Sequence, residues 1–478
     1  MLAGALLFVL AIGAPGAALA LTAVDVAGTI DGKSVTVAEV DRAAGAPAAR
    51  TWREIHAIMR SAARGVCIDR IETMLASAEG VDPITWRARI WQQSAPTEAQ
   101  AEAYVHQHPE LYPGGNADLS AVAHRIRVES YRARSLAAAE RSLTHDFLLF
   151  LVPLENPPAG EPAIPEVVGR CLGRPITGED VERYAAYPLY RRRAGLVSEL
   201  CRQFDVDYSR PLVLERAAAA AGKSTEALLA EVEGDLGELS RRDVEREAID
   251  RFGRVDEVTL AKARLALDSV RRNDRRMAFL ERIRREMHAE CLLPMPKAPS
   301  AEVRTEGIAT GPSEGLRVSY FGNFTCPSCP AGWEILTQLQ SKYGRELRVA
   351  FHHHFPESDF RPFAIALEAH CTARQGRFFE YGSWRTSTDG SGSAVDALGL
   401  DADGFARCAA NPTTAVEILD DTAEALRLGF RDAVPSWVVG ERPRRGFQGQ
   451  RRIETAVEQQ LAARREASDA PNEEQTND

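Results

Sequence analysis

The stretch that decides how this chain folds reads Phe321-Gly-Asn-Phe-Thr-Cys-Pro-Ser-Cys-Pro330. The apolar run from Val318 to Phe321 predicts a buried strand, and the apolar spacing that follows predicts a helix over 330–343. Gly344 is typical of a residue that ends a helix. The two cysteines therefore lie where a buried strand gives way to a helix N-terminus.

A Cys-x-x-Cys pair at the start of a helix has a clear chemical use. The unpaired N–H groups and partial positive charge of the helix N-terminus favour a thiolate over a thiol. Two intervening residues keep the second sulfur close enough to form a disulfide and to resolve a mixed one. We therefore predict that Cys326 is the attacking thiolate and Cys329 the resolving thiol, with no bound cofactor.

Two other interpretations of this cysteine pair are less favoured. A Cys-x-x-Cys motif can be half of a zinc site, and His352, His353 and His354 follow in the sequence. They belong to an apolar run typical of a strand, so their side chains alternate between two faces and at most two can reach one metal ion. A purely structural bridge over so short a loop adds little stability. We expect no metal.

The segment from about Gly315 to Leu461 resembles the DsbA-like branch of the thioredoxin superfamily. It carries the family's landmarks in the family's order, and each is a short motif at an expected element boundary. They are Phe321–Cys329, His354–Pro356, Gln375–Phe379, Leu398–Asp401, Phe405–Cys408 and Val434–Gly440. The resemblance implies an α/β thioredoxin fold with inserted helices, in a chain whose N-terminal part is a mainly α tandem duplication.

The same resemblance implies roles for residues around the cysteine pair. Pro435 is expected to be a cis-proline beside the redox site, and Val434 to offer its backbone to an extended substrate chain. The family often has Gly-Thr-Pro where this chain has Ala433-Val434-Pro435, so the substrate preference is expected to differ. Pro327 and Ser328 form the modulating redox loop. Serine lacks the charge of the histidine frequent there, so we expect a less oxidising couple than the strongest family oxidants.

Six further cysteines lie outside the motif. The inserted helices are expected to bring Cys371 and Cys408 together as a candidate structural disulfide, since helical insertions in this branch can do so. Cys67 and Cys201 lie in long amphipathic stretches and are expected to be small buried hydrophobes. A bridge between Cys171 and Cys291 is an option that spacing alone does not determine.

The region from about Val26 to Ser300 is an internal duplication. The run Asp31–Val40 matches Leu172–Val181 at an offset of 141, and Val152-Pro153 matches Leu293-Pro294 at the same offset. Two copies of one helical unit, each ending in a Pro-rich linker, are therefore expected. The predicted segments are a signal peptide at 1–20, helical modules at 21–160 and 161–300, a thioredoxin-like domain at 301–465 and a disordered tail at 466–478.

The helical unit resembles the N-terminal module of SurA-type periplasmic chaperones. The likeness is carried by Asp31-Gly32 with Val35-Thr36, and by Pro96-Thr-Glu with Tyr104 and His108–Tyr112. It implies that the modules hold unfolded clients, although a spacer or dimerisation arm remains the alternative. The sequence leaves no room for a parvulin domain, so no prolyl isomerase activity is expected.

Two local patterns complete these expectations. Trp52, Trp86 and Trp91 lie on helical segments and are expected to be core residues. A Gly/Ser/Thr-rich stretch between Tyr381 and Ala397 predicts a loop that interrupts the inserted helices.

The N-terminus indicates where the protein works. Leu2–Leu21 is apolar and ends in Ala18-Leu-Ala20, typical of a bacterial-type signal peptide. This predicts a periplasmic or otherwise exported protein, with membrane attachment only if the segment stays uncleaved. Export also suits disulfide chemistry. A net charge of −10 argues against nucleic acid as a partner.

Together these patterns predict an exported protein thiol–disulfide oxidoreductase with chaperone-like modules. Its expected partners are unfolded or cysteine-containing client proteins and, as the family resemblance implies, a membrane quinone-linked thiol oxidase that recycles it. Two alternatives remain open: a disulfide reductase or isomerase, and a non-redox periplasmic chaperone that only binds clients.

Overall fold

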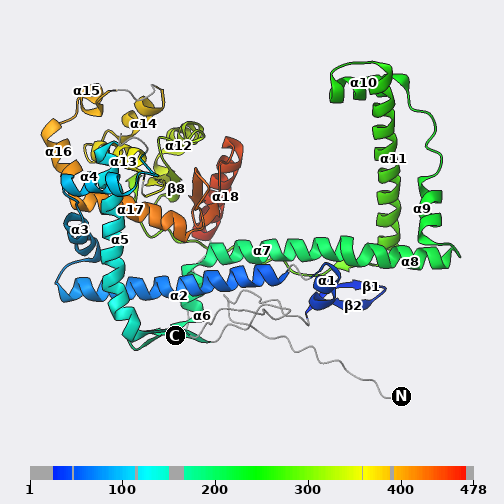
Figure 1. Cartoon of the computed structure of the whole chain (residues 1–478), viewed down its shortest axis with the longest axis horizontal. Coiled ribbons are helices and arrows are strands. Elements are labelled where there is room, and N and C mark those ends of the chain that lie inside the picture. The colour runs from blue at the N-terminus through cyan, green and yellow to red at the C-terminus, as the bar shows by residue number, and fades with distance from the viewer. Residues whose placement is uncertain are drawn as a thin grey trace. The chain divides into compact units, whose positions relative to one another are not determined.

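The computed structural model describes residues 25–45, 48–112, 117–149, 166–357, 359–387 and 392–469 of the 478-residue chain. The predicted signal peptide lies outside these residues. The described chain is mainly helical (Figure 1). It forms two compact units. The described residues within 25–56 and 192–297 belong to unit 1, and those within 57–149, 166–191 and 298–469 belong to unit 2. Two helices, α2 (Ala48–Ala78) and α7 (Ala186–Gln203), contribute residues to both units.

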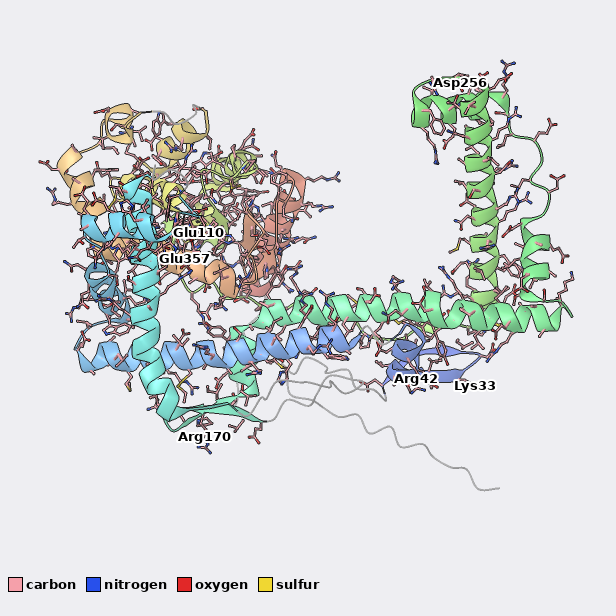
Figure 2. All side chains as sticks on the ribbon, viewed as in Figure 1. Lys33, Arg42, Glu110, Arg170, Asp256 and Glu357 are labelled. Carbon is pink, nitrogen blue, oxygen red and sulfur yellow. A yellow bond between two sulfur atoms is a disulfide. The ribbon has the colours of Figure 1, made fainter. Side chains whose placement is uncertain are left out.

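The duplication is visible in two hairpins of the same design. Strands β1 (Val26–Ile30) and β2 (Lys33–Thr36) recur 141 residues later as β4 (Val167–Cys171) and β5 (Arg174–Thr177). Arg170 projects from β4 and Lys33 begins β2 (Figure 2). The two copies of the repeat therefore form the same backbone hairpin at equivalent positions.

The hairpin turns are also the same. Asp31 and Gly32 have φ of 49° and 72°, and Leu172 and Gly173 have φ of 52° and 72°. Two consecutive residues with positive φ make the turn that suits the right-handed twist of a two-residue hairpin. The glycine adopts this conformation without the steric cost that a side chain brings.

Each hairpin leads into a short helix that starts in the same way. Thr36 caps α1 (Val37–Ala43) and Thr177 caps α6 (Gly178–Tyr184). In both cases the third helical residue, Glu39 or Asp180, accepts a hydrogen bond from the backbone of the cap residue. These reciprocal bonds satisfy N–H groups that a helix start otherwise leaves unpaired.

The third strand of each sheet comes from the other copy of the repeat. In unit 1 the order is β2-β1-β6, and β6 (Glu290–Cys291) ends the second copy. In unit 2 the order is β3-β4-β5, and β3 (Phe147–Leu149) ends the first copy. Each of these sheets therefore combines strands from both copies of the repeat.

Two disulfides correct the expectations for the cysteines of this region. Cys67 on α2 is bonded to Cys171 on β4, and Cys201 on α7 is bonded to Cys291 on β6. The interpretation of Cys67 and Cys201 as plain buried hydrophobes was therefore wrong, and so was a bridge between Cys171 and Cys291. The pairing depends on which helix each exchanged strand lies against, and sequence spacing carries no such information.

The rest of unit 1 is helical. A π-helical turn at Phe204–Ser209 lies between α7 and α8 (Arg210–Ala220), and its Phe204 ring lies so close to β1 that a Cβ at Gly28 would come within 2.6 Å of it. Asp256 caps the longest helix of this unit through the backbone N–H of Thr259 (Figure 2). The remaining helices of unit 1 are α8 (Arg210–Ala220), α9 (Thr225–Glu233), α10 (Arg241–Phe252) and α11 (Glu257–Glu286).

Unit 2 is built on a five-stranded sheet in the order β11-β10-β8-β9-β7. The two central strands, β8 and β9, are parallel and joined through a helix, while the outer strands pair antiparallel. This is a thioredoxin-like arrangement, as the sequence predicted for this part of the chain. The strands are β7 (Ile308–Thr310), β8 (Leu316–Gly322), β9 (Leu347–His353), β10 (Ser436–Val439) and β11 (Arg442–Arg444).

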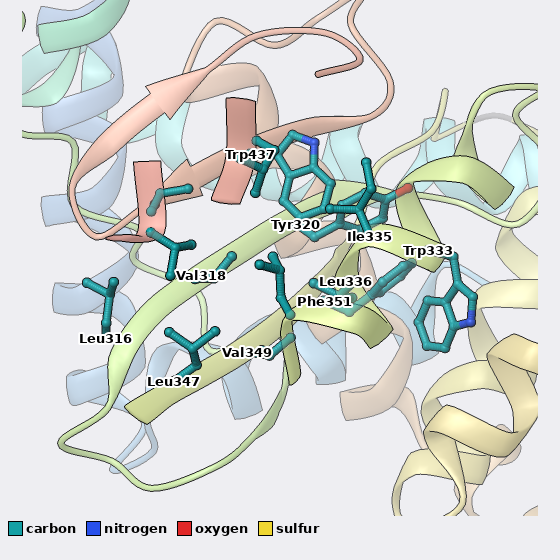
Figure 3. Packing of buried hydrophobic residues seen from close by; sticks show 14 of the residues in the cluster. Leu316, Val318, Tyr320, Trp333, Ile335, Leu336, Leu347, Val349, Phe351 and Trp437 are labelled. Carbon is teal, nitrogen blue, oxygen red and sulfur yellow. The ribbon is translucent and has the colours of Figure 1, made fainter. Parts of the chain in front are cut away.

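The core of this sheet forms where α12 (Cys329–Tyr343) crosses β8 and β9 (Figure 3). Leu336 of the helix is fully buried, and Tyr320 and Trp437 meet edge to face with ring centroids 4.6 Å apart. Alternate side chains of a central strand face opposite sides of the sheet, and both sides are covered here. The cysteine-bearing helix start is thus anchored by packed apolar side chains.

Inserted helices lie between β9 and β10. The predicted loop over 381–397 is wrong in part, because α14 continues to Ser387 and α15 begins at Ala394. The inserted helices are α13 (Phe360–Ala373), α14 (Phe378–Ser387), α15 (Ala394–Leu398), α16 (Ala402–Ala410) and α17 (Pro412–Arg427).

Helices of the first repeat pack onto this insertion within unit 2. Trp91 of α3 is 2% exposed, and its ring centroid lies 5.8 Å from that of Phe363 on α13. Arg87 of α3 bonds Asp420 of α17 at 2.7 Å. The first repeat therefore supplies part of the hydrophobic core beside the sheet. Its helices are α3 (Pro83–Gln93), α4 (Glu98–Gln107) and α5 (Leu119–Asp146).

The chain's last described helix corrects another expectation. Helix α18 runs over Gln450–Asp469, so residues 466–469 are helical where a disordered tail was predicted. The remainder of that tail lies outside the described residues. Trp52, Trp86 and Trp91 are all buried, as expected for core residues. Among the described residues, no helix combines the length and apolar character needed to span a membrane.

Candidate functional site

The cysteine pair follows β8 through a short turn that Asn323 holds in place. Its side-chain oxygen accepts hydrogen bonds from the backbone N–H and the hydroxyl of Thr325, at 2.9 and 2.8 Å. Its amide nitrogen donates to the carbonyl oxygen of His354, which follows the neighbouring strand β9, at 2.7 Å. One buried side chain thus fixes the loop to both central strands.

Cys326 and Cys329 form a disulfide at the start of α12, with their Cα atoms 5.3 Å apart. Cys329 is 4% exposed and Cys326 is half-buried. The N–H of Cys329 donates to the carbonyl oxygen of Cys326 at 3.2 Å, which closes the turn that begins the helix. A thiol that approaches from solvent can therefore reach Cys326, while the second sulfur is shielded.

The cis-proline loop lies directly beside this disulfide. The Val434–Pro435 peptide bond is cis, Pro435 is buried and Val434 is half-buried. The carbonyl oxygen of Val434 lies 3.9 Å from the Cys326 sulfur. Ser436 steadies the loop, because its hydroxyl donates to the carbonyl oxygen of Ala433 at 2.6 Å. The structure thus brings together the residues that the sequence analysis selected at positions 326, 329, 434 and 435.

Ser328 links the two parts of the site. Its hydroxyl donates to the carbonyl oxygen of Val434 at 3.3 Å and lies 3.6 Å from the Cys326 sulfur. The side chain makes no capping bond to α12. Pro327 is exposed at the outer edge of the loop. Sequence reasoning treated Ser328 only as a residue that lacks charge, because its contact with a loop 106 positions away is a tertiary feature.

Tyr320 supports the site from beneath and was not predicted as a site residue. Its hydroxyl donates to the carbonyl oxygen of Cys329 at 3.3 Å. Gly332 allows this approach, since a Cβ there would come within 2.6 Å of the hydroxyl oxygen. Burial raises the pKa of Tyr320, so it stays a neutral donor. Its position in the sequence, near the end of the strand that leads into the cysteine motif, could have indicated that Tyr320 lies beneath the site.

The three histidines on and after β9 face different surroundings. His352 shares a 2.9 Å hydrogen bond with Asp421 of α17. Burial lowers the pKa of His353 to about 3 and that of His354 to about 4, so both are neutral near pH 7. Among the described residues, no group of three or more His, Cys, Asp or Glu side chains has an arrangement that could hold a metal ion.

The remaining predicted cysteines lie in the inserted helices. Cys371 of α13 is bonded to Cys408 of α16, and their Cα atoms are 5.6 Å apart. Cys371 is fully buried. The bond joins two inserted helices of unit 2. The two cysteines of this bond are 37 positions apart in the sequence, whereas Cys326 and Cys329 are 3 positions apart.

Comparisons with known proteins find likeness in structure only. The sequence matches no protein-family model and no curated protein. About a third of the chain is similar in fold to several solved structures. Alpha-DsbA1 of Wolbachia pipientis is 14% identical over 34% of this chain and 94% of its own, with a TM-score of 0.30.

Two further solved structures give similar values. BdbD of Bacillus subtilis, in its oxidised form, is 15% identical over 34% of this chain and 96% of its own, with a TM-score of 0.29. A thioredoxin-like oxidoreductase from Silicibacter pomeroyi is 22% identical over 33% of this chain and 91% of its own, with a TM-score of 0.27.

Proposed function

We propose that this protein is an exported thiol–disulfide oxidoreductase that forms or rearranges disulfides in client proteins. The observation that carries the proposal is a half-buried Cys326 at a helix start, bonded to a shielded Cys329 and 3.9 Å from the carbonyl oxygen of Val434. The difference in access selects Cys326 as the sulfur that a client thiolate attacks.

The proposed reaction balances within the client and the cysteine pair. A client thiolate attacks the Cys326 sulfur, the Cys326–Cys329 bond breaks, and Cys329 leaves with the electron pair. A second client thiolate then attacks the client sulfur of the mixed disulfide, and Cys326 leaves as a thiolate. The client is oxidised and the protein reduced. A quinone-linked membrane oxidase is the proposed acceptor of these electrons.

Val434 and Pro435 are proposed to receive the client backbone. Pro435 has no N–H, and the half-buried Val434 can offer its carbonyl oxygen to an extended chain beside Cys326. Such main-chain pairing gives affinity with little dependence on the client's side chains. This suits a protein that acts on many cysteine-containing clients.

The decisive experiment measures oxidation of a reduced, cysteine-containing client by the full chain. We expect Cys326→Ser to abolish turnover. In Cys329→Ser, the free Cys326 thiolate should attack a disulfide-bonded client, release one client cysteine as a thiolate and keep the other in a mixed disulfide, because no resolving thiol remains on the protein. The pKa of Cys326, followed by thiolate absorbance in Cys329→Ser, is expected to fall below the free-thiol value of about 8.5. An unreactive Cys326 with an unperturbed pKa would contradict the proposal.

The residues between the two cysteines also bear on whether the protein oxidises or reduces its clients. Because Ser328 carries no charge, we expect a potential below the strongly oxidising end of the family, which lies at roughly −120 mV. Equilibration with glutathione at several ratios measures it. A value as high as that limit would contradict this part of the proposal, whereas a much lower one would favour a reductase or isomerase.

Client holding is a second proposed activity, and the exposed apolar side chains of α10 and α11 favour it. Val258 is 59% exposed and Leu265 is 72% exposed, while Ile249 and Phe252 are also exposed. The occupant we propose is an apolar segment of an unfolded client, the kind of substrate the redox site requires. A Cys326→Ser, Cys329→Ser variant that still suppresses client aggregation would separate this activity from the chemistry.

A further inference from the structure

We infer that the Ser328 hydroxyl is a shared hydrogen-bond donor that connects client docking at Val434 with thiolate release at Cys326. The inference rests on the proposed function and assigns a role within the same site. It arises from one geometric fact: a single hydroxyl lies 3.3 Å from the Val434 carbonyl oxygen and 3.6 Å from the Cys326 sulfur.

The hydroxyl can serve only one of these neighbours at a time. A serine side chain has one O–H proton, so it donates one strong hydrogen bond. Both neighbours lie within reach of a rotation about the Ser328 side chain. The usual competing use, capping the helix that begins at Cys329, is not made here. The proton is therefore free to be partitioned between the carbonyl oxygen and the sulfur.

The oxidation state decides which neighbour is preferred. In the disulfide form the Cys326 sulfur carries no charge and accepts weakly, so the hydroxyl donates to Val434, as the structure shows. When Cys326 becomes a thiolate it is an ionised acceptor, and charge-assisted hydrogen bonds are roughly twice as strong as neutral ones. The hydroxyl then turns from Val434 to Cys326.

Client docking also turns the Ser328 hydroxyl away from Val434 and toward Cys326. A client backbone N–H that pairs with the Val434 carbonyl competes with the Ser328 hydroxyl for that oxygen. Once displaced, the hydroxyl is available to the Cys326 sulfur during the second exchange step. In that step a client thiolate attacks the client sulfur, the bond to Cys326 breaks, and the electron pair stays on Cys326. Ser328 thus stabilises the leaving thiolate while the client occupies Val434.

The test compares the full chain with Ser328→Ala and with Ser328→Thr, which keeps the hydroxyl. A lost hydrogen bond to a charged group corresponds to about a tenfold effect. We therefore expect Ser328→Ala to raise the pKa of the Cys326 thiol by about one unit, in a Cys329→Ser background. Equilibration with glutathione should shift about tenfold toward the disulfide form, which corresponds to about 30 mV. Ser328→Thr should restore both values.

Steady-state oxidation of a reduced client separates this role from a structural one. In Ser328→Ala, kcat should fall about tenfold while KM stays level or falls, because the Val434 carbonyl no longer has a competing donor. A higher KM with unchanged kcat would overturn the inference, as would an unchanged thiol pKa. Turnover by the unaltered chain with no effect of Ser328→Ala would overturn the inference and leave the proposed function intact. Failure of the unaltered chain to oxidise any client would instead overturn the proposed function.

Discussion

The two copies of the repeat differ in what covers the apolar faces of their helices. In the first copy, Trp91 of α3 and Tyr131 of α5 are buried against the inserted helices of the five-stranded sheet, beside Phe363. In the second copy, α10 and α11 bury a small apolar face between them through Val244, Ala248 and Ala263, and Leu265 is 72% exposed. One copy has become structural support for the cysteine site, while the other retains apolar surface in contact with solvent.

This difference shows that a repeat's fold does not fix its role. Both copies begin with the same hairpin and the same capped helix, and each sheet is completed by the other copy's end strand. The two copies differ in the surface against which their later helices pack. Four predictions test the contrast.

The largest expected effect comes from the cross-links of the exchanged strands. Cys67→Ala with Cys171→Ala opens a bridge of 104 residues, and the chain-entropy account assigns roughly 4–5 kcal/mol to such a loop. We expect this loss in unit 2, together with weaker client oxidation. Unfolding in denaturant, with segment-resolved hydrogen exchange, measures it.

The matched control removes the other cross-link. Cys201→Ala with Cys291→Ala opens a bridge of 90 residues, so the entropic loss is similar but falls on unit 1. Client oxidation at the cysteine site should then stay unchanged. Equal loss of oxidation in both double variants would contradict the contrast between the two units.

The second prediction removes a buried ring from the first copy. Trp91→Ala should lower the free energy of unfolding by about 3–5 kcal/mol, since a large buried ring leaves a cavity that its neighbours fill only in part. Leu265→Ala in the second copy is the control and should stay within about 0.5 kcal/mol. Thermal and denaturant unfolding measure both. A large loss in the exposed position would show that α11 is covered after all.

The third prediction uses pH at the contact between α3 and α17. Burial raises the pKa of Asp420 to about 7, although Arg87 opposes the rise. The folded state therefore binds a proton between about pH 4 and 7 that the unfolded state has released, and stability falls as pH rises through this window. Asp420→Asn should remove about 2 kcal/mol of this dependence, since its side chain is partly exposed.

The measurement is the free energy of unfolding from pH 4 to 8 for both proteins. His353 and His354 act in the opposite sense, because their lowered pKa values cost stability as pH falls below about 6.5. They contribute equally to both proteins, so the difference isolates Asp420. Parallel curves would show that this carboxyl group is not perturbed.

The fourth prediction, with the smallest expected effect on stability, concerns the second copy alone. Val258→Ser with Leu265→Ser should weaken suppression of client aggregation, because each buried aliphatic side chain contributes about 1.5 kcal/mol or more to an apolar contact. Stability should change little, since both side chains are exposed. Light scattering of an unfolding client measures it. Undiminished suppression would place the client-holding surface elsewhere.

Local sequence was enough to predict the strand and the helix that flank the cysteine pair. The strand before the motif, the helix after it and its end at Gly344 depend on apolar periodicity and backbone preference within about 20 residues. The capped helices at Thr36 and Thr177 were readable for the same reason. The loop expected between Tyr381 and Ala397 was wrong in part, because helix α14 continues to Ser387 and α15 begins at Ala394, where helical packing outweighed a polar composition.

The sequence by itself determined the cysteine pair, the strand and helix that present it, and the existence of a duplication, because each is written in residues close together or at one constant offset. Only the tertiary structure decided the rest. It exchanged the end strands, paired Cys67 with Cys171 and Cys201 with Cys291, placed Ser328 against Val434, and packed helices of the first repeat against those inserted in the five-stranded sheet. Such contacts depend on which surfaces meet in space, and apolar periodicity says that a face is buried without saying against what.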